Sequence, residues 1–295
     1  SIQQLQDLID LFPQAIWAEC DRGNLDVFSP PQLERQGLRV SPDGKHRVAP
    51  GEDGHLEVFN LQTGLYEASL AISRANRGWR SGRYQGHFIS NQRFLYHNGE
   101  KWLIWNVMDD RLEPRPIPEV FTTFKGASDD GRYLALSKNA ESPEVWIYDF
   151  DAGKEISVLS GMDHNPRGMV FSPDGSLVTS IGWDKRVQVW ESQTGTISHV
   201  LTGHKQGVAS AAFSYDGKSI CTSSPDGTIR LWHLDTGREM VHFTPEGVGA
   251  DKLRFSRDNQ LLLIFGREQT WTLRVPSLRT IDEELSKKHS TEKTS

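Results

Sequence analysis

Short apolar or aromatic stretches alternate with polar turns along almost the whole chain. The stretches 145–148, 187–190 and 229–232 are rich in β-branched and aromatic side chains, and Gly, Pro, Asn and Asp bound them. Short stretches of this composition between turn residues predict β-strands. Large side chains occur at both odd and even positions, which indicates strands that are buried on both faces. We therefore expect an all-β fold built from many short strands.

The first recurring marker is a turn of the form Ser-x-Asp-Gly. Its copies occupy residues 41–44, 128–131, 172–175, 214–217 and, with Asn in the last place, 256–259. The last four copies are spaced 44, 42 and 42 residues apart. Pro in the second place presets a type I turn, Ser can cap the turn, and Gly suits the fourth place. The sequence therefore contains an internal repeat of about forty residues.

Two further markers follow each turn in a constant order. The second marker is an aromatic residue that closes a strand, and its copies are Phe59, Trp105, Tyr148, Trp190 and Trp232, with Leu273 as a degenerate copy. The third marker is a turn that ends on Gly64, Gly153, Gly195 or Gly237. Each unit thus predicts four strands. One such sheet buries too little area to be stable alone, whereas a ring of sheets buries both faces and protects the strand edges.

The unit at 202–237 resembles the WD repeat, the family that builds β-propellers. The residues that carry the resemblance are Gly203-His204, the segment 213–217 and the segment 226–232. The resemblance covers about 37–281 and is strongest over 125–237, although the Trp-Asp dipeptide itself is absent at the strand ends. It implies a WD40-type β-propeller with seven four-stranded blades. Six repeats are clear from residue 38 onward, and 15–28 form half of an atypical N-terminal blade; six blades plus a hairpin is the alternative.

The chain ends have a different pattern from the repeats. Within 1–14, Ile2, Leu5, Ile9 and Phe12 follow a helical spacing that stops at Pro13, which predicts a helix covering one end of the propeller or binding a partner. The propeller is expected over 15–281. Residues 282–295 are polar and predict a flexible tail.

Composition narrows the class of protein. The chain has 295 residues, 36% of them hydrophobic, and a net charge of -6, which argues against a global nucleic-acid footprint. No apolar run approaches the roughly 18 residues that span a membrane, so no membrane association is expected. Two cysteines exclude a disulfide framework and fit a reducing compartment, the cytoplasm or the nucleus.

The motifs of common enzyme classes are not found. The sequence has no nucleophile elbow, no phosphate-cradling loop ending in Lys-Ser/Thr, and no zinc-ligand spacing. We therefore expect no catalytic residue, metal or cofactor. The resemblance implies a non-catalytic scaffold for protein–protein interactions, part of a multi-subunit complex or the docking or sensing domain of a longer chain. The alternative is a propeller enzyme or small-ligand binder that uses the central channel.

The resemblance also implies a structural hydrogen-bond network inside the blade. In the unit 202–237 the matching residues are His204, Thr222, Asp226 and Trp232; in the preceding unit they are Ser180, Asp184 and Trp190. Met162 occupies the place of the histidine in that preceding unit, and His164 lies two residues away as a substitute. Buried imidazole, carboxylate, hydroxyl and indole groups satisfy one another in such a network.

Trp183 is the first candidate for binding a partner. It lies in the turn before Asp184, and the resemblance places this turn on the top face of the propeller. Exposed tryptophans are over-represented among binding hot spots, and Arg167, Lys185 and Lys205 can surround this one with positive charge. The alternative is an indole that packs flat against its own blade.

The second candidate surface is the segment 73–85, which carries four arginines and no acid. Its candidate contact residues are Arg77, Trp79, Arg80, Arg83 and Tyr84. Arginine forks suit the carboxylates or phosphates of an acidic or phosphorylated protein segment. A solvated loop paired with the chain's own acids is an alternative. Single-stranded nucleic acid is another, which the net negative charge disfavours.

Overall fold

The computed structural model describes residues 39–41, 45–50, 55–61, 63–71, 86–97, 101–113, 117–244, 251–256, 258–266 and 270–274. Every regular element within these ranges is a β-strand. The same ranges contain no helix of the length and hydropathy that membrane crossing requires. The all-β class is confirmed.

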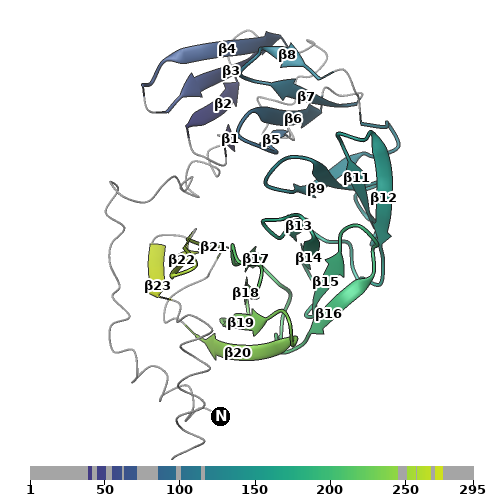
Figure 1. The fold of residues 1–295 in the computed structure, drawn as a ribbon, viewed down its shortest axis with the longest axis vertical. Helices are drawn as coiled ribbons and strands as arrows, with labels where there is room; N and C mark the ends of the chain where they lie inside the picture. The colour runs from purple at the N-terminus through teal and green to yellow at the C-terminus, as the bar shows by residue number, and fades with distance from the viewer. Residues whose placement is uncertain are drawn as a thin grey trace, which may run out of the picture. The chain divides into compact units, whose positions relative to one another are not determined.

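The described residues before Ala209 form one compact unit of four antiparallel sheets (Figure 1). The first sheet contains β1 (Arg39–Val40), β2 (His46–Pro50), β3 (His55–Asn60) and β4 (Tyr66–Ala71). The second contains β5 (Gly86–Phe88), β6 (Arg93–His97), β7 (Trp102–Asn106) and β8 (Arg111–Leu112). The third contains β9 (Thr123–Ala127), β10 (Tyr133–Ser137), β11 (Val145–Asp149) and β12 (Lys154–Leu159). The fourth contains β13 (Gly168–Phe171), β14 (Leu177–Ile181), β15 (Val187–Glu191) and β16 (Ile197–Leu201).

The described residues from Ala209 onward form a second compact unit of two sheets. One sheet contains β17 (Ser210–Phe213), β18 (Ser219–Ser223), β19 (Ile229–His233) and β20 (Arg238–Phe243). The other has three strands, β21 (Lys252–Phe255), β22 (Leu261–Phe265) and β23 (Thr270–Arg274). In every sheet consecutive strands pair with each other, so each of the six repeats predicted from residue 38 onward forms one antiparallel sheet.

Several predicted parts lie outside the described residues. These are the N-terminal helix at 1–14, the atypical blade at 15–28, the arginine-rich segment 73–85 and the tail at 282–295. The domain boundaries and the seventh blade therefore stay predictions.

The Ser-x-Asp-Gly turn has one geometry in four repeats. In each, the serine hydroxyl donates to the aspartate two residues later at 2.5–2.6 Å and accepts the backbone N–H five residues later at 2.9 Å. The fourth residue has a positive φ of 59–71°, and the residues in this place are Gly131, Gly175, Gly217 and Asn259. Glycine and asparagine tolerate this left-handed conformation best, so the Asn copy keeps the turn.

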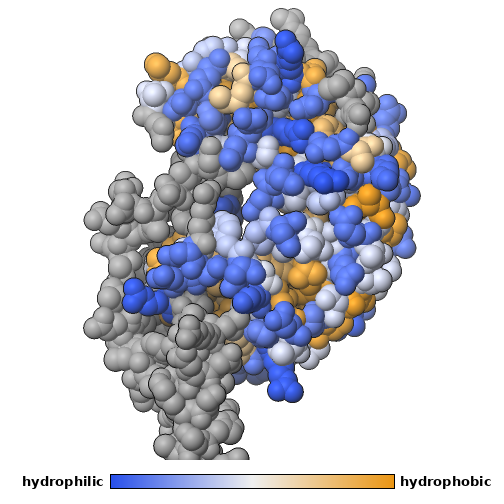
Figure 2. Space-filling model, viewed as in Figure 1, coloured by the Kyte–Doolittle hydropathy of each residue, from blue (hydrophilic) through white to orange (hydrophobic). Residues whose placement is uncertain are grey.

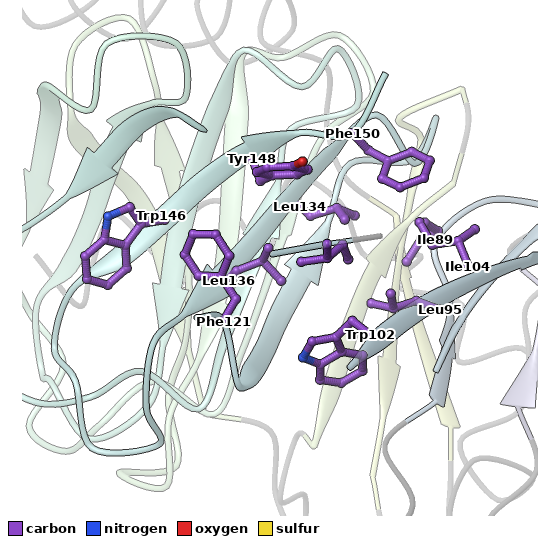
Figure 3. Packing of buried hydrophobic residues seen from close by; sticks show 11 residues of the cluster. Ile89, Leu95, Trp102, Ile104, Phe121, Leu134, Leu136, Trp146, Tyr148 and Phe150 are labelled. Carbon is purple, nitrogen blue, oxygen red and sulfur yellow. The ribbon is translucent and has the colours of Figure 1, made fainter. Parts of the chain in front are cut away.

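The core lies between successive sheets. Figure 3 shows the cluster that Trp102 and Ile104 of β7 form with Leu134 of β10 and Trp146 of β11. The ring of Phe121 lies 6.1 Å from that of Trp146, measured between centroids. Corresponding clusters join the first sheet to the second, the third to the fourth, and the two sheets of the second unit. This packing explains the apolar residues at both parities of the central strands.

Gly195 and Gly64 offer a matched test of packing between sheets. Both end the turn between the third and fourth strands of their sheet, and both have a φ of +72°. A Cβ atom on Gly195 would lie 2.6 Å from the Val158 carbonyl oxygen in the preceding sheet, whereas one on Gly64 would meet nothing within 4 Å. We expect Gly64→Ala to cost about 1–2 kcal/mol through the left-handed backbone alone.

Gly195→Ala is expected to cost about 1–3 kcal/mol more than Gly64→Ala, because the added methyl group forces the sheets apart. Urea unfolding of the two variants measures the difference. Equal losses of stability would show that the approach of Val158 to this turn is not tight.

Candidate functional site

The turn that carries Trp183 lies between two other loops of the first unit, the loop before β13 and the loop after β16. Gly182, at the start of this turn, donates its N–H to the Val208 carbonyl oxygen at 2.9 Å. On one side, a Cβ atom on Gly182 would lie 3.1 Å from the backbone nitrogen of Arg167. On the other side, a Cβ atom on Gly207 would lie 2.3 Å from the Gly182 oxygen. The turn is therefore held between the loop before β13 and the loop after β16.

The Trp183 side chain is 71% exposed, more than any other large hydrophobic residue that the structure describes. It does not pack flat against its own blade. Figure 2 shows a largely hydrophilic surface with smaller apolar patches on the visible face of the described residues. A large hydrophobic residue left exposed to water marks a candidate interaction site.

The loop before β13, which lies beside the Trp183 turn, is held by hydrogen bonds to the third sheet and to one of its connecting loops. Asn165 Nδ2 donates to the Ala140 carbonyl oxygen at 2.6 Å. Lys125 Nζ, from β9, donates to the Pro166 carbonyl oxygen at 2.7 Å, and burial lowers the pKa of this lysine. The loop beside Trp183 is therefore fixed to its neighbours before any partner binds. These contacts join residues 25 and 41 positions apart, and no local pattern in the sequence indicated them.

The Asp184 carboxylate holds the turn through hydrogen bonds. It accepts the Arg186 backbone N–H at 3.0 Å, the Arg186 guanidinium at 3.3 Å and the Asp163 N–H at 3.4 Å. Burial works to raise the pKa of Asp184, but these hydrogen bonds and the Arg186 charge outweigh it and lower the pKa. Arg186 also pairs with the Asp163 carboxylate at 2.6 Å. Asp184 of the turn and Asp163 of the loop before β13 thus share one arginine, which the sequence prediction missed although Arg186 follows Asp184 by two positions.

The three predicted cations around Trp183 come from three different loops. Arg167, Lys185 and Lys205 are all exposed. Neither Arg167 nor Lys185 has an ion-pair partner among the described residues. The predicted contacts of the other surface, Arg77, Trp79, Arg80, Arg83 and Tyr84, lie outside the described residues and stay predictions.

The predicted network of the unit 202–237 is seen in part. Trp232 Nε1 donates to Thr222 Oγ1 at 2.9 Å, inside the second compact unit. Asp226 accepts the Thr228 N–H at 2.8 Å and the Thr228 hydroxyl at 2.6 Å. His204 is buried and belongs to the first unit. The complete network stays a prediction.

The network predicted for the preceding blade includes Trp190. Trp190 Nε1 donates to the Ser160 carbonyl oxygen at 3.2 Å. The backbone carbonyl is a strong acceptor and satisfies the indole by itself. Met162 is buried in the place of the histidine, where it packs in the apolar cluster, and His164 is exposed. In this blade Met162 thus contributes packing and Asp184 pairs with Arg186, and the network of Ser180, Asp184 and Trp190 stays a prediction.

Metal-ligand clusters and reactive thiols are two kinds of group that would suggest a reaction among the described residues. They include no group of three or more His, Cys, Asp and Glu side chains that could hold a metal ion. Cys221 is a buried free thiol whose pKa burial raises strongly, so it is not a thiolate at neutral pH. The arrangement around Trp183 offers an apolar anchor and charges, which can bind a ligand.

Comparison with known proteins agrees with the geometry. The family model "WD domain, G-beta repeat" matches residues 153–191 and 195–233. "Periodic tryptophan protein 2 homolog" of Mus musculus is 24% identical over 154 residues, and "Protein hir-1" of Neurospora crassa is 26% identical over 168 residues. These matches cover 52% and 55% of this chain but only 16% and 14% of the relatives. A chain from the "Crystal Structure of Mitotic Checkpoint Complex" has the same fold, with a TM-score of 0.61 and 15% identity over 81% of this chain and 73% of that one.

The six antiparallel sheets and the fold match define a β-propeller. The family model recognises two of the six repeats as WD40 repeats, and the recurring turn and closing aromatic residues of the other repeats resemble theirs.

Replacing Asp226 tests the intact part of the network. We expect Asp226→Ala to cost about 1–3 kcal/mol, because the two donor groups of Thr228 lose their acceptor in the turn before β19. Asp235→Ala is the control, since the Asp235 side chain is 73% exposed. Thermal unfolding measures both variants. An unchanged melting temperature for Asp226→Ala would contradict a structural role.

Replacing Asp184 tests the turn that carries Trp183, through its pH dependence. The lowered pKa means that the Asp184 carboxylate stabilises the fold above about pH 4 and loses this effect as the pH falls through the folded-state pKa. We expect Asp184→Asn to be less stable than the parent by about 1–3 kcal/mol at pH 7. The difference should narrow below about pH 4.

Asp163→Asn serves as the control for Asp184→Asn, because its side chain is 62% exposed. A surface ion pair contributes little, so this variant should differ from the parent by less than about 1 kcal/mol. Denaturant unfolding at several pH values measures all three proteins. A pH-independent difference for Asp184→Asn would rule out a stabilising role for the charge.

Proposed function

We propose that this chain is a non-catalytic WD40 scaffold that binds a segment of another protein at the loops around Trp183. The observation that carries the proposal is the exposed Trp183 on a turn whose residues Gly182 and Asp184 form hydrogen bonds to the two neighbouring loops. A tryptophan contributes large contact area at low entropic cost, and a preformed frame lowers the cost of binding further. The partner is a protein segment of acidic or phosphorylated character, as the cations near Trp183 favour.

The setting of this function is a protein assembly inside the cell. A chain of similar fold occurs in the crystal structure of the mitotic checkpoint complex. This supports a place for this chain in a multi-subunit complex or in a longer protein. The few cysteines, one of them the buried free thiol of Cys221, support the cytoplasm or the nucleus.

Trp183→Ala tests the binding surface directly. We expect this variant to capture at least tenfold less of its partner proteins than the parent does, because truncation of a hot-spot residue costs about 2 kcal/mol or more of binding free energy. Its stability should stay within about 0.5 kcal/mol of the parent, since the side chain is 71% exposed. Affinity capture from cell extract with quantitative mass spectrometry measures the first effect, and thermal unfolding measures the second.

Leu65→Ala is the matched control, because Leu65 is another large hydrophobic residue with 66% exposure in the same compact unit. It should retain the partners that Trp183→Ala loses. If every protein captured by the parent is also captured by Trp183→Ala, the binding surface lies elsewhere.

A further inference from the structure

We propose that the segment bound at Trp183 carries separate carboxylates on either side of an apolar residue, and that Arg167 and Lys185 select these carboxylates. This inference rests on the proposed function, because it names the chemistry of the partner at the same site.

The local charge around Trp183 is opposite to that of the whole chain. Arg167, Lys185, Lys205 and Arg186 outnumber the carboxylates of the same loops, Asp163 and Asp184. The chain as a whole has a net charge of -6. A local positive surface attracts an acidic segment even though the protein as a whole is acidic.

Arg186 is not available to the partner. Its guanidinium pairs with Asp163 at 2.6 Å and with Asp184 at 3.3 Å, and both acids raise its pKa. A planar guanidinium that can take two oxygens at once is the group best suited to grip a phosphate. The guanidinium nearest to Trp183 in the chain is therefore already occupied by the protein's own acids, and Arg167 is the one arginine of these loops without an ion-pair partner within the described residues.

The available charges are separate rather than convergent. Arg167 belongs to the loop beside Gly182, whereas Lys185 follows Trp183 by two residues in the turn itself. Both side chains are exposed and neither is paired within the described residues. Two single positive charges on different loops complement two single negative charges spaced along a peptide better than one phosphate dianion.

The indole supplies the apolar part of the recognition. Its 71% exposure leaves a large ring surface for an apolar side chain of the partner to cover. Burial of that surface gives affinity, and the charges on the two loops give selectivity and a faster encounter.

A displayed library of random dodecapeptides, sorted against the parent protein and against Trp183→Ala, tests the inference. We expect the peptides that bind in a Trp183-dependent manner to be enriched in Asp and Glu on both sides of an apolar residue. The double variant Arg167→Glu/Lys185→Glu should bind them at least tenfold more weakly. Raising the salt concentration from about 50 to 300 mM should weaken binding to the parent and change the residual binding of the double variant little.

Lys154→Glu/Lys218→Glu is the control, since it changes the net charge by the same amount at two exposed lysines outside the loops around Trp183. It should bind the selected peptides as the parent does. Each selected peptide is also synthesised with phosphoserine in place of one acidic residue. The phosphorylated form should bind no more than tenfold more tightly than the carboxylate form.

The outcomes separate the inference from the proposed function. If no peptide depends on Trp183, the proposed function itself fails. If Trp183-dependent peptides show no acidic enrichment, or bind the Arg167→Glu/Lys185→Glu variant as well as the parent, the inference is overturned and the binding site stands. Binding of the phosphorylated form more than tenfold tighter would also overturn it, in favour of a phosphate ligand.

Discussion

The second and third sheets of this protein bury side chains on both of their faces, and the packing between successive sheets depends on this double burial. β11 shows it most directly, because all five of its residues are buried. Trp146 and Tyr148 pack in the cluster shared with the second sheet, whereas Val145 and Ile147 pack in the cluster shared with the fourth. A sheet with apolar residues on both faces cannot be stable without its neighbours, so stability within each compact unit is shared between successive repeats.

Double burial places strict demands on the turns at the edges of the sheets. Ser172 and Ser214 are almost fully buried at the ends of β13 and β17, where a hydroxyl without a partner would be costly. Each donates to the aspartate of its own turn and accepts a backbone N–H of the next strand. A left-handed fourth residue then returns the chain to the sheet. The same few atoms thus satisfy the buried polar groups and direct the strand that follows.

The outward-facing side chains of the loops around Trp183 do not pack between sheets. The backbone of these loops is held by contacts such as Gly182 to Val208 and Asn165 to Ala140, so the side chains above it can vary without loss of the fold. This division between a repetitive core and individual loops explains how one architecture supports binding to many different proteins. Function in such a chain lies in the few side chains that the core does not need.

The sequence by itself determined the number, order and type of the described sheets from residue 38 onward, and it singled out Trp183. Turn chemistry and strand alternation depend on residues that are close in the sequence. The repeat can therefore be recognised wherever the turn recurs, even where Asn259 replaces glycine. Only the tertiary structure decided that Trp183 is exposed, that Trp190 donates to Ser160, and that Arg186 is shared by Asp163 and Asp184. These features depend on which loops of successive sheets come within hydrogen-bond distance, and packing between residues far apart in the chain sets that distance.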